Sequence, residues 1–234
     1  MEKGFVWING ASSGIGEATA RSFAAERIPL LLTARRSDKL QQIKSELESS
    51  SSLEIRALDI SDINSVKQFD VSQITGGYPD CLINNAGITT FTPAENDSIE
   101  LISEIINTNL TGAIACIKQV LPGMIERRQG TIINILSAAA KKIFTNSSIY
   151  AASKAGLAMY SKVLREEVRK YNIRVINIYP GATATPIWPE SVLAKHSERM
   201  MSPSDLGNYV REVYKQSGSV ITEEIELRPL RGDI

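Results

Sequence analysis

The sequence predicts an α/β fold, a doubly wound parallel sheet of seven strands with helices on both faces. Short apolar runs alternate with longer amphipathic ones along the chain, which is the pattern of repeated β-α-β units. The 234 residues are 43% hydrophobic and 22% charged, so they can bury a substantial core within the size of one α/β domain. We therefore expect a single domain over residues 1–234.

Seven short runs, rich in β-branched and other apolar residues, are predicted to be the strands. In chain order they are residues 4–9, 30–34, 54–58, 80–84, 131–136, 174–178 and 225–228. Parallel strands place their carboxyl ends at one edge of the sheet, and open α/β sheets bind ligands there. The residues that follow these runs are therefore the first candidates for a functional site.

Six longer segments carry apolar residues at helical spacing and are predicted to be helices. They are residues 15–26, 38–48, 64–74, 99–126, 149–171 and 204–214. The segment 183–203 breaks the alternation, because it carries three prolines and its large apolar residues follow no regular period. Such a segment is typical of a mobile lid over a ligand, and equally of a loop packed on its own domain. We predict it to be the substrate loop, and leave open whether Met200 and Met201 belong to a lid.

The composition argues against several classes of partner. Lys plus Arg and Asp plus Glu number 26 each, so no excess of basic charge suggests nucleic acid or a membrane surface. No apolar run is long enough to span a membrane, and residues 5–8 are too few for a signal peptide, so we predict a cytoplasmic protein. Cys81 and Cys116 are expected to be reduced core residues. His196 has no cluster of ligands around it, so no metal site is predicted.

A glycine-rich turn, NGASSGIG at residues 9–16, follows the first predicted strand and opens the first predicted helix. Its glycines let the backbone approach a pyrophosphate, whose charge would meet free N–H groups at the helix N-terminus. The alternative is a tight β-α turn with no ligand. The predicted cofactor contacts in the turn are Gly10, Ser12, Ser13, Gly14, Ile15 and Gly16.

The end of the second predicted strand favours NADP over NAD. Sites that select NAD usually carry Asp or Glu about 20 residues beyond the glycines. Residues 33–36 read TARR instead, and a guanidinium can hold a 2′-phosphate through two parallel hydrogen bonds. We assign this role to Arg35; the alternative for Arg35 and Arg36 is a solvated loop before a helix.

The third and fourth predicted strands end beside the expected path of the dinucleotide. Asp59 and Ile60 follow the third strand, and Asn85, Ala86 and Gly87 follow the fourth. The small side chains of Ala86 and Gly87 permit close approach of a ligand. All five residues are therefore predicted to bind the cofactor.

A Tyr and a Lys one helical turn apart form the candidate acid. Tyr150 and Lys154 share a face of the predicted helix 149–171, and an adjacent cation stabilises a phenolate, so that the phenol becomes a better proton donor. Ser137 follows the strand 131–136 at the ligand-binding edge of the sheet. Together these side chains could reduce a carbonyl, whereas the Tyr–Lys pair alone would also fit an ordinary helix.

These motifs, in this order and spacing, resemble the short-chain dehydrogenase/reductase family of single-domain, Rossmann-type enzymes over residues 3–228. The C-terminal segment 223–234 is similar to bacterial sepiapterin-reductase-like members and lacks the Gly-Gly ending common in 3-ketoacyl-carrier-protein reductases. One departure is Asn9, where the family usually has Thr, although its amide can still hydrogen-bond across the turn. The residues that carry the resemblance are the turn 10–16, Asp59, the run 84–87, Asn109, Ser137, Tyr150, Lys154, Pro180, Gly181, Thr183 and Thr185.

The resemblance implies a catalytic set of Asn109, Ser137, Tyr150 and Lys154. Tyr150 would donate the proton and Ser137 would steady the substrate oxygen. Lys154 would lower the pKa of the tyrosine and hold the ribose, and Asn109 would organise a water for proton relay. The resemblance also implies further contacts with the nicotinamide end of the cofactor, from Pro180, Gly181, Thr183 and Thr185.

The predicted function is NADPH-dependent reduction of a ketone or aldehyde to an alcohol, with the tyrosine as proton donor. The substrate would contact Ser137, Ala139, Phe144, Tyr150 and Trp188, which do not identify the carbonyl compound. The resemblance also suggests a homodimer or homotetramer formed through the helices 99–126 and 149–171.

Two other functions remain open. One is reduction of a 3-ketoacyl thioester on an acidic acyl carrier protein, which could dock on a patch of basic residues; such residues are more often a solvated helix end. The patch would comprise Arg127, Arg128, Arg169 and Lys170. The other is a non-catalytic NADP(H) redox sensor, which would not need the full catalytic set.

Overall fold

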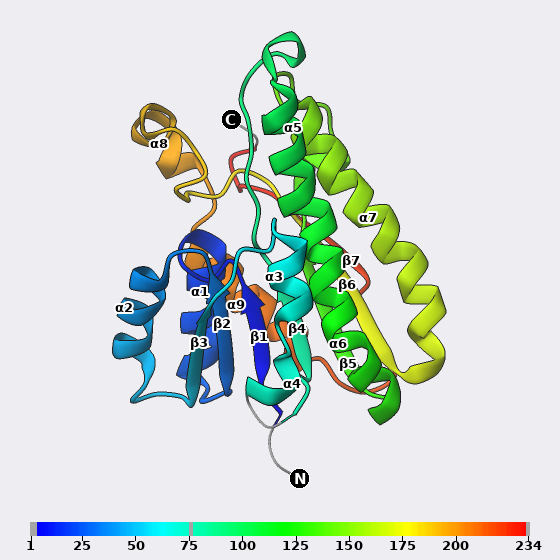
Figure 1. Ribbon diagram of the computed structural model, residues 1–234. Coiled ribbons are helices and arrows are strands. Elements are labelled where there is room, and N and C mark those ends of the chain that lie inside the picture. Colours follow the sequence, from blue (N-terminus) through cyan, green and yellow to red (C-terminus); the bar gives the residue numbers. More distant parts are fainter. Residues whose placement is uncertain (1–3, 75–76, 233–234) are drawn as a thin grey trace.

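The computed structural model describes residues 4–74 and 77–232, which form one parallel sheet with helices on both faces (Figure 1). The strand order is β3-β2-β1-β4-β5-β6-β7, and every neighbouring pair is parallel. The strands are β1 (Val6–Asn9), β2 (Leu30–Ala34), β3 (Leu53–Ala57), β4 (Cys81–Asn84), β5 (Gly130–Ile135), β6 (Ile173–Pro180) and β7 (Glu224–Leu227). This confirms the predicted fold class, and each strand begins and ends within two residues of its predicted bounds.

The described helices cover the two faces in two groups. They are α1 (Gly14–Ala25), α2 (Ser37–Leu47), α3 (Ile63–Gln68), α4 (Val71–Ile74), α5 (Ile99–Ile106), α6 (Ala113–Arg127), α7 (Ser148–Val168), α8 (Glu190–His196) and α9 (Pro203–Lys215). Short turns add η1 (Ala94–Asn96), η2 (Asn107–Gly112), η3 (Ala138–Ala140), η4 (Arg169–Tyr171) and η5 (Ser197–Arg199), of which η2 is a π-helical turn and the others are 3₁₀ turns.

Two apolar cores lie on opposite faces of the sheet, as the alternation along β1 requires. Ile8 packs into a core with Phe23 of α1 and Val210 of α9. Trp7 points the other way, into a core with Val120 of α6 and residues of α7. Strand order reverses between β1 and β4, because β2 and β3 lie on one side of β1 and the later strands on the other. The loops after β1 and β4 therefore open a crevice at this switch point.

The prediction of one continuous helix over residues 99–126 is wrong. The chain forms α5, the π turn η2, and then α6. Apolar spacing cannot reveal the break, because one π turn changes the helical period for only a few residues. Asn109 lies within this π turn, and its side chain is fully buried against other elements of the fold.

Two further segments differ from the predicted elements. The predicted helix 64–74 is split into α3 and α4 between Gln68 and Val71. Phe69 stacks on Trp7 at the break, with ring centroids 5.2 Å apart, and Asp70 accepts a hydrogen bond from the backbone N–H of Ser72. Within the segment 183–203, α8 and η5 form although no helix was predicted. No residue of α8 is buried, so α8 leaves no amphipathic pattern in the sequence.

Candidate active site

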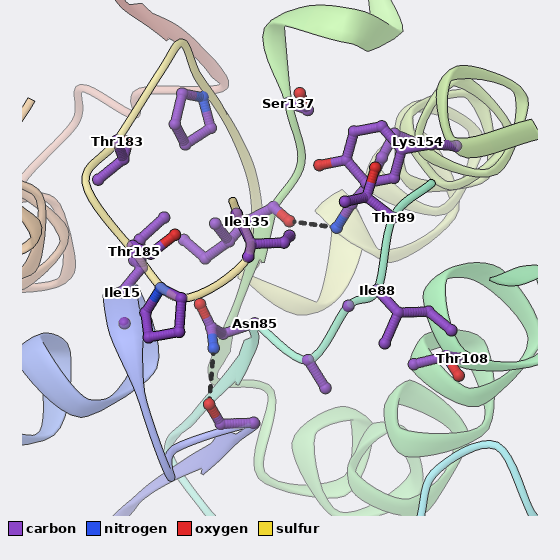
Figure 2. Close-up of a pocket in the computed structure, with 18 of the residues that line it drawn as sticks. Ile15, Asn85, Ile88, Thr89, Thr108, Ile135, Ser137, Lys154, Thr183 and Thr185 are labelled. Atoms are coloured by element: carbon purple, nitrogen blue, oxygen red, sulfur yellow. Dashed lines mark hydrogen bonds between the residues drawn. The ribbon is translucent and has the colours of Figure 1, made fainter. Parts of the chain in front are cut away.

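The cavity lies at the carboxyl edge of the sheet and has a volume of about 850 Å³. It extends from the end of β2 to the start of α7, past the loops that follow β1, β3, β4, β5 and β6. This volume is within the range of about 300–1,000 Å³ typical of small-molecule sites. Figure 2 shows residues that follow β1, β4, β5 and β6, together with Lys154 of α7, around one space.

The glycine-rich turn forms one wall, and its backbone requires two of its glycines. Gly10 and Gly14 have φ values of 68° and 60°, in the left-handed region that favours glycine. Ser13 is the N-cap of α1, yet its side chain makes no capping hydrogen bond, so the N–H groups of the first turn remain available to an anion. Gly16 was predicted to contact the cofactor, but it lies behind the turn, where a Cβ would collide with Gly10 O and Asn85 Nδ2.

Asn9, the departure from the family pattern, braces this wall against the next loop. Its Oδ1 accepts hydrogen bonds from the backbone N–H groups of Asn85 and Ala86, both at 2.9 Å. Asn85 Nδ2 donates in turn to the carbonyl of Gly10 at 2.9 Å (Figure 2). The Asn9 side chain was expected to hydrogen-bond across the turn, but its bonds run instead to the neighbouring loop, so the loops after β1 and β4 form one unit.

Two arginines line the far end of the cavity, beside Ala34 at the end of β2. Arg36 Nη2 donates to the hydroxyls of Ser12 and Ser13 at 3.0 and 2.8 Å. Arg35 is 55% exposed and lies 3.8 Å from a Glu104 carboxylate oxygen. The assignment of a 2′-phosphate to Arg35 stays a prediction, and Arg36 joins it as a second candidate.

One buried hydroxyl in this region has no hydrogen-bond partner among the described residues. Thr108 is 6% exposed, lines the cavity, and leaves its Oγ1 unpaired (Figure 2). Buried polar atoms are nearly always satisfied in native proteins, so such an atom indicates a missing partner. An unpaired hydroxyl, a left-handed glycine turn, an uncapped helix end and two guanidiniums fit a dinucleotide with a phosphate on its ribose.

The catalytic candidates meet at the other end of the cavity. The Oγ of Ser137 accepts the backbone N–H of Ala139 at 3.1 Å, which leaves the hydroxyl hydrogen free to donate. Burial raises the pKa of Tyr150, and the nearby Ser137 side chain acts in the opposite direction. We expected Lys154 to lower the tyrosine pKa, but burial dominates the shift and Lys154 is not among the groups that change it.

Lys154 is 4% exposed, and its Nζ lies 6.0 Å from the centre of the Tyr150 ring. The ammonium donates to the carbonyl of Ile135 at 2.9 Å (Figure 2). Burial lowers the pKa of Lys154 to about 8. The side chain is therefore mainly charged at neutral pH, and two of its three hydrogens remain for other acceptors.

Asn109 does not line the cavity, although it was predicted as a catalytic residue. Its Nδ2 donates to the carbonyl of Ile88 at 2.9 Å and to Ser153 Oγ at 3.0 Å, and its Oδ1 accepts the N–H of Ile88 at 2.9 Å. Both hydrogens of the amide are thus used inside the protein. Gly87 lies beside it, where a Cβ would be 3.3 Å from both Asn109 Oδ1 and Lys154 Nζ.

The end of the cavity that was predicted to hold the substrate is apolar and aromatic. Phe91 from the loop after β4 stacks on Trp188 from the loop after β6, with ring centroids 5.0 Å apart at 20°. Trp188 Nε1 donates to the carbonyl of Thr183 at 3.1 Å, which fixes the indole. Ala139 and Phe144 also line this end, and their contact with a substrate stays a prediction.

The remaining predicted cofactor residues line the cavity as well. They are Ile15, Asp59, Ile60, Ala86, Gly87, Pro180, Gly181 and Thr185, besides those already described. Sequence reasoning missed other lining residues, chiefly Thr89, Phe91, Thr108, Thr145, Ser147 and Ile187. Several of them directly follow or precede a motif, and proximity to a motif was the only indication available. Met200 and Met201 are not among the described lining residues; Met201 pairs instead with Thr183 at the neck of the loop.

Comparison with known proteins agrees with this arrangement. A family model described as short chain dehydrogenase matches residues 5–195. The chain belongs to this family. A sepiapterin reductase from Chlorobaculum tepidum is 35% identical over 241 residues, covering 99% of this chain and 98% of that protein.

Two solved structures resemble this short-chain dehydrogenase. The closed form of serine dehydrogenase complexed with NADP+ has a TM-score of 0.88 at 29% identity, and covers 95% of this chain and 94% of its own. An alcohol dehydrogenase from the archaeon Thermococcus sibiricus, complexed with 5-hydroxy-NADP, has a TM-score of 0.88 at 27% identity, covering 99% and 98%. Both confirm the Rossmann-type fold of the chain.

The basic residues considered as a carrier-protein dock lie at the opposite edge of this short-chain dehydrogenase. Arg127 and Arg128 stand just before β5 begins, and η4 stands just before β6 begins. Arg127 donates to the carbonyl of Pro79, and Arg128 donates to that of Lys170. These groups are engaged by their neighbours at the amino edge of the sheet, whereas the cavity opens at the carboxyl edge.

Two further features of this short-chain dehydrogenase are the length and polarity of its helices and the state of its two cysteines. Across residues 4–74 and 77–232, no helix combines the length and apolar character needed to cross a membrane. Cys81 and Cys116 are free and buried, as predicted, and burial raises the pKa of the Cys116 thiol to about 12. Neither thiol is therefore placed to act as a nucleophile.

Proposed function

We propose that the chain is an NADPH-dependent reductase of a neutral ketone or aldehyde that carries a planar or bulky apolar group. The observation that carries this proposal is the convergence of Ser137, Tyr150 and Lys154 at one end of the cavity, opposite the glycine turn and the arginines. The family's oxidoreductase chemistry and the NADP in the two similar structures support it.

The cofactor would be held by backbone and side chains in turn. The first turn of α1 would meet the pyrophosphate, and Arg35 and Arg36 with the hydroxyls of Ser12 and Ser13 would meet a 2′-phosphate. Thr108 has a hydroxyl free for a nearby ribose or base. When bound, the reduced nicotinamide supplies the hydride.

The chain's own residues would manage the charge and the proton. A carbonyl oxygen at this end can accept hydrogen bonds from the Ser137 hydroxyl and the Tyr150 phenol, which strengthen as negative charge builds on that oxygen. Tyr150 then gives its proton to the oxygen, and the Lys154 ammonium stabilises the resulting phenolate. Lys154 is buried and Tyr150 is half-buried, so little water would screen the ammonium from the phenolate.

The lining supports a neutral, apolar substrate. The charged side chains among the described lining residues are Arg35, Arg36, Asp59 and Lys154. The first three lie at the end of the cavity with the glycine turn, which we call the nucleotide end. A substrate carboxylate or phosphate at the other end would find only Lys154, which the reaction uses. The Phe91–Trp188 stack instead favours a flat or bulky apolar group.

A substrate panel under one NADPH assay tests this proposal. Neutral aromatic or heteroaromatic ketones should be reduced with the highest kcat/KM, simple aliphatic ketones with a lower one, and ketoacyl thioesters and keto acids with the lowest. A preference for the keto acids or the ketoacyl thioesters would contradict the proposed substrate class. Tight NADPH binding without turnover of any carbonyl would contradict the proposed reaction and favour a sensor.

We also propose a homo-oligomer formed through the outer faces of α5 and α7. Ile99 of α5 is 71% exposed, and Met159 and Val163 of α7 are 61% and 54% exposed. Exposed apolar residues on adjacent helices are typical of a protein interface. Light scattering after size exclusion should give a mass above one chain of 25.6 kDa, and Val163→Glu should lower it.

A further inference from the structure

The buried face of α7 is fastened by hydrogen bonds along its length. Ser153 and Ser161 are both completely buried on this face, two turns apart, with Lys154 and Leu157 between them. Serine is a weak helix former because its hydroxyl competes for the backbone, so two fully buried serines in one helix need a reason. Their contacts supply it.

Ser153 joins the first turns of α7 to the π turn. Its Oγ donates to the carbonyl of Tyr150 at 2.7 Å, and accepts a hydrogen from Asn109 Nδ2 at 3.0 Å. Asn109 is fixed on its other side to the backbone of Ile88, just beyond the loop after β4. The backbone of the catalytic tyrosine is thus tied through a single hydroxyl to the wall of the cofactor cavity.

Ser161 repeats the arrangement further along the helix. Its Oγ donates to the carbonyl of Leu157 at 2.7 Å, and accepts from Asn134 Nδ2 at 3.0 Å. Asn134 lies on β5, three residues before Ser137. The strand that carries one catalytic hydroxyl is therefore tied to the helix that carries the other.

We infer that Ser153 and Ser161 are positioning residues that hold α7 in the one rotational setting that brings the Tyr150 phenol to Ser137. Apolar packing is non-directional and tolerates small rotations and slides of a helix, whereas buried hydrogen bonds have strict geometry and a high cost of being broken. The inference rests on the proposed reaction for its kinetic readout.

The two serines differ in their distance from the reacting atoms, and this predicts a gradation. Ser153 bonds directly to the Tyr150 backbone and to the residue packed beside Gly87 and Lys154, so its loss should displace the phenol most. Ser161 acts from the far side of Leu157, and its loss should be partly absorbed by the turns between.

The test compares Ser153→Ala and Ser161→Ala with Ser22→Ala. Ser22 is a matched control, because it is also a buried helical serine that donates to an Asn oxygen and accepts from a second side chain. Ser22 lies on α1 where that helix packs against α9, and it does not line the cavity. Each variant loses a comparable set of hydrogen bonds, so each should lower Tm by about 2–4 °C.

The catalytic effects should separate the three variants. Ser153→Ala should lower kcat about tenfold, the loss expected for a sub-ångström displacement, and Ser161→Ala about two- to threefold. Ser22→Ala should leave kcat unchanged, and the NADPH dissociation constant should stay constant in all three. Equal kcat losses in all three, or no loss in Ser153→Ala, would overturn the inference. Should Ser153→Ala fail to fold, Ser153→Cys keeps a weak donor and should show an intermediate kcat.

A second readout needs no substrate. The ultraviolet titration of Tyr150, isolated by subtracting that of Tyr150→Phe, should shift its midpoint in Ser153→Ala and not in Ser22→Ala, because the phenol moves relative to Lys154 and Ser137. An unmoved midpoint in Ser153→Ala would contradict the inference. If the protein reduces no carbonyl but the midpoint shifts, the proposed reaction fails while the positioning role stands.

Discussion

At the nucleotide end of the cavity the backbone provides most of the predicted contacts, whereas at the catalytic end side chains provide them. The turn after β1 relies on left-handed Gly10 and Gly14 and on the uncapped N-terminus of α1. The proposed catalytic end offers two hydroxyls and an ammonium, from the loop after β5 and from α7, and buried hydrogen bonds hold these elements together. An added Cβ should therefore damage the first end, and a lost polar atom the second.

The largest effect is expected at the catalytic end. Tyr150→Phe removes the proton donor and should lower kcat by about 10²–10⁴-fold, the usual contribution of general acid catalysis. NADPH binding, measured by fluorescence, should stay within about twofold, because the ring is retained. Tyr160→Phe is the control, since Tyr160 lies on the same helix but does not line the cavity. Near-normal turnover in Tyr150→Phe would remove Tyr150 from the mechanism.

The matching test at the nucleotide end adds one carbon atom. In Gly10→Ala the new Cβ would lie 2.5 Å from Ala86 Cα, at a φ of 68°. We expect the NADPH dissociation constant to rise about 30-fold, because left-handed strain and backbone displacement of a few kcal/mol fall on the turn itself. Gly77→Ala is the control, since a Cβ there meets nothing within 4 Å. Unchanged binding in Gly10→Ala would refute a backbone-built site.

A smaller effect should follow from pH. Burial lowers the pKa of Lys154 to about 8, so its charge is present below that pH and is lost above it. Reduction should therefore decline through about pH 8, by roughly tenfold for each further pH unit. The Lys154→Arg variant keeps its charge, so its kcat should not decline near pH 8. Its kcat should be lower than that of the wild type at every pH. A flat kcat profile of the wild type between pH 7 and about 9.5 would contradict the role of the ammonium.

The smallest effect is expected where side chains assist the nucleotide end. Arg35→Ala and Arg36→Ala should each raise KM for NADPH about five- to tenfold, with little change for NADH, since each removes a charged hydrogen bond to the 2′-phosphate. A change in only one variant would assign the phosphate to that arginine. An unchanged NADPH-to-NADH ratio in both would contradict the preference for NADP.

The sheet and most of the site could be predicted because their causes are local. Each strand is an apolar run bounded by turn residues, and β2 begins and ends where its sequence predicts. The glycine turn, the Tyr–Lys pair and Ser137 are recognisable by spacing along the chain. Their meeting at one edge then follows from parallel connectivity.

Other residues could not be placed in this way, because their direction depends on distant contacts. Asn109 and Gly16 belong to motifs, yet both lie behind the cavity wall. Phe91 belongs to no motif, yet it reaches the cavity by stacking on a residue of another loop. Arg36, first weighed as a solvated loop residue, bonds to the serines of the turn.

The amino-acid sequence by itself determined the order of the elements, the family, and the side chains proposed for proton transfer, because periodicity and motif spacing are written along the chain. Tertiary structure alone decided the π turn, the helical segment of the substrate loop, the stacked rings and the raised pKa of Tyr150. The π turn and the pKa of Tyr150 depend on burial and on partners far away in the chain, such as Asn109 and Ser153 for the π turn. The stacked rings come from two separate loops, and α8 has no buried residue that would leave a pattern, so no local pattern encodes these features either.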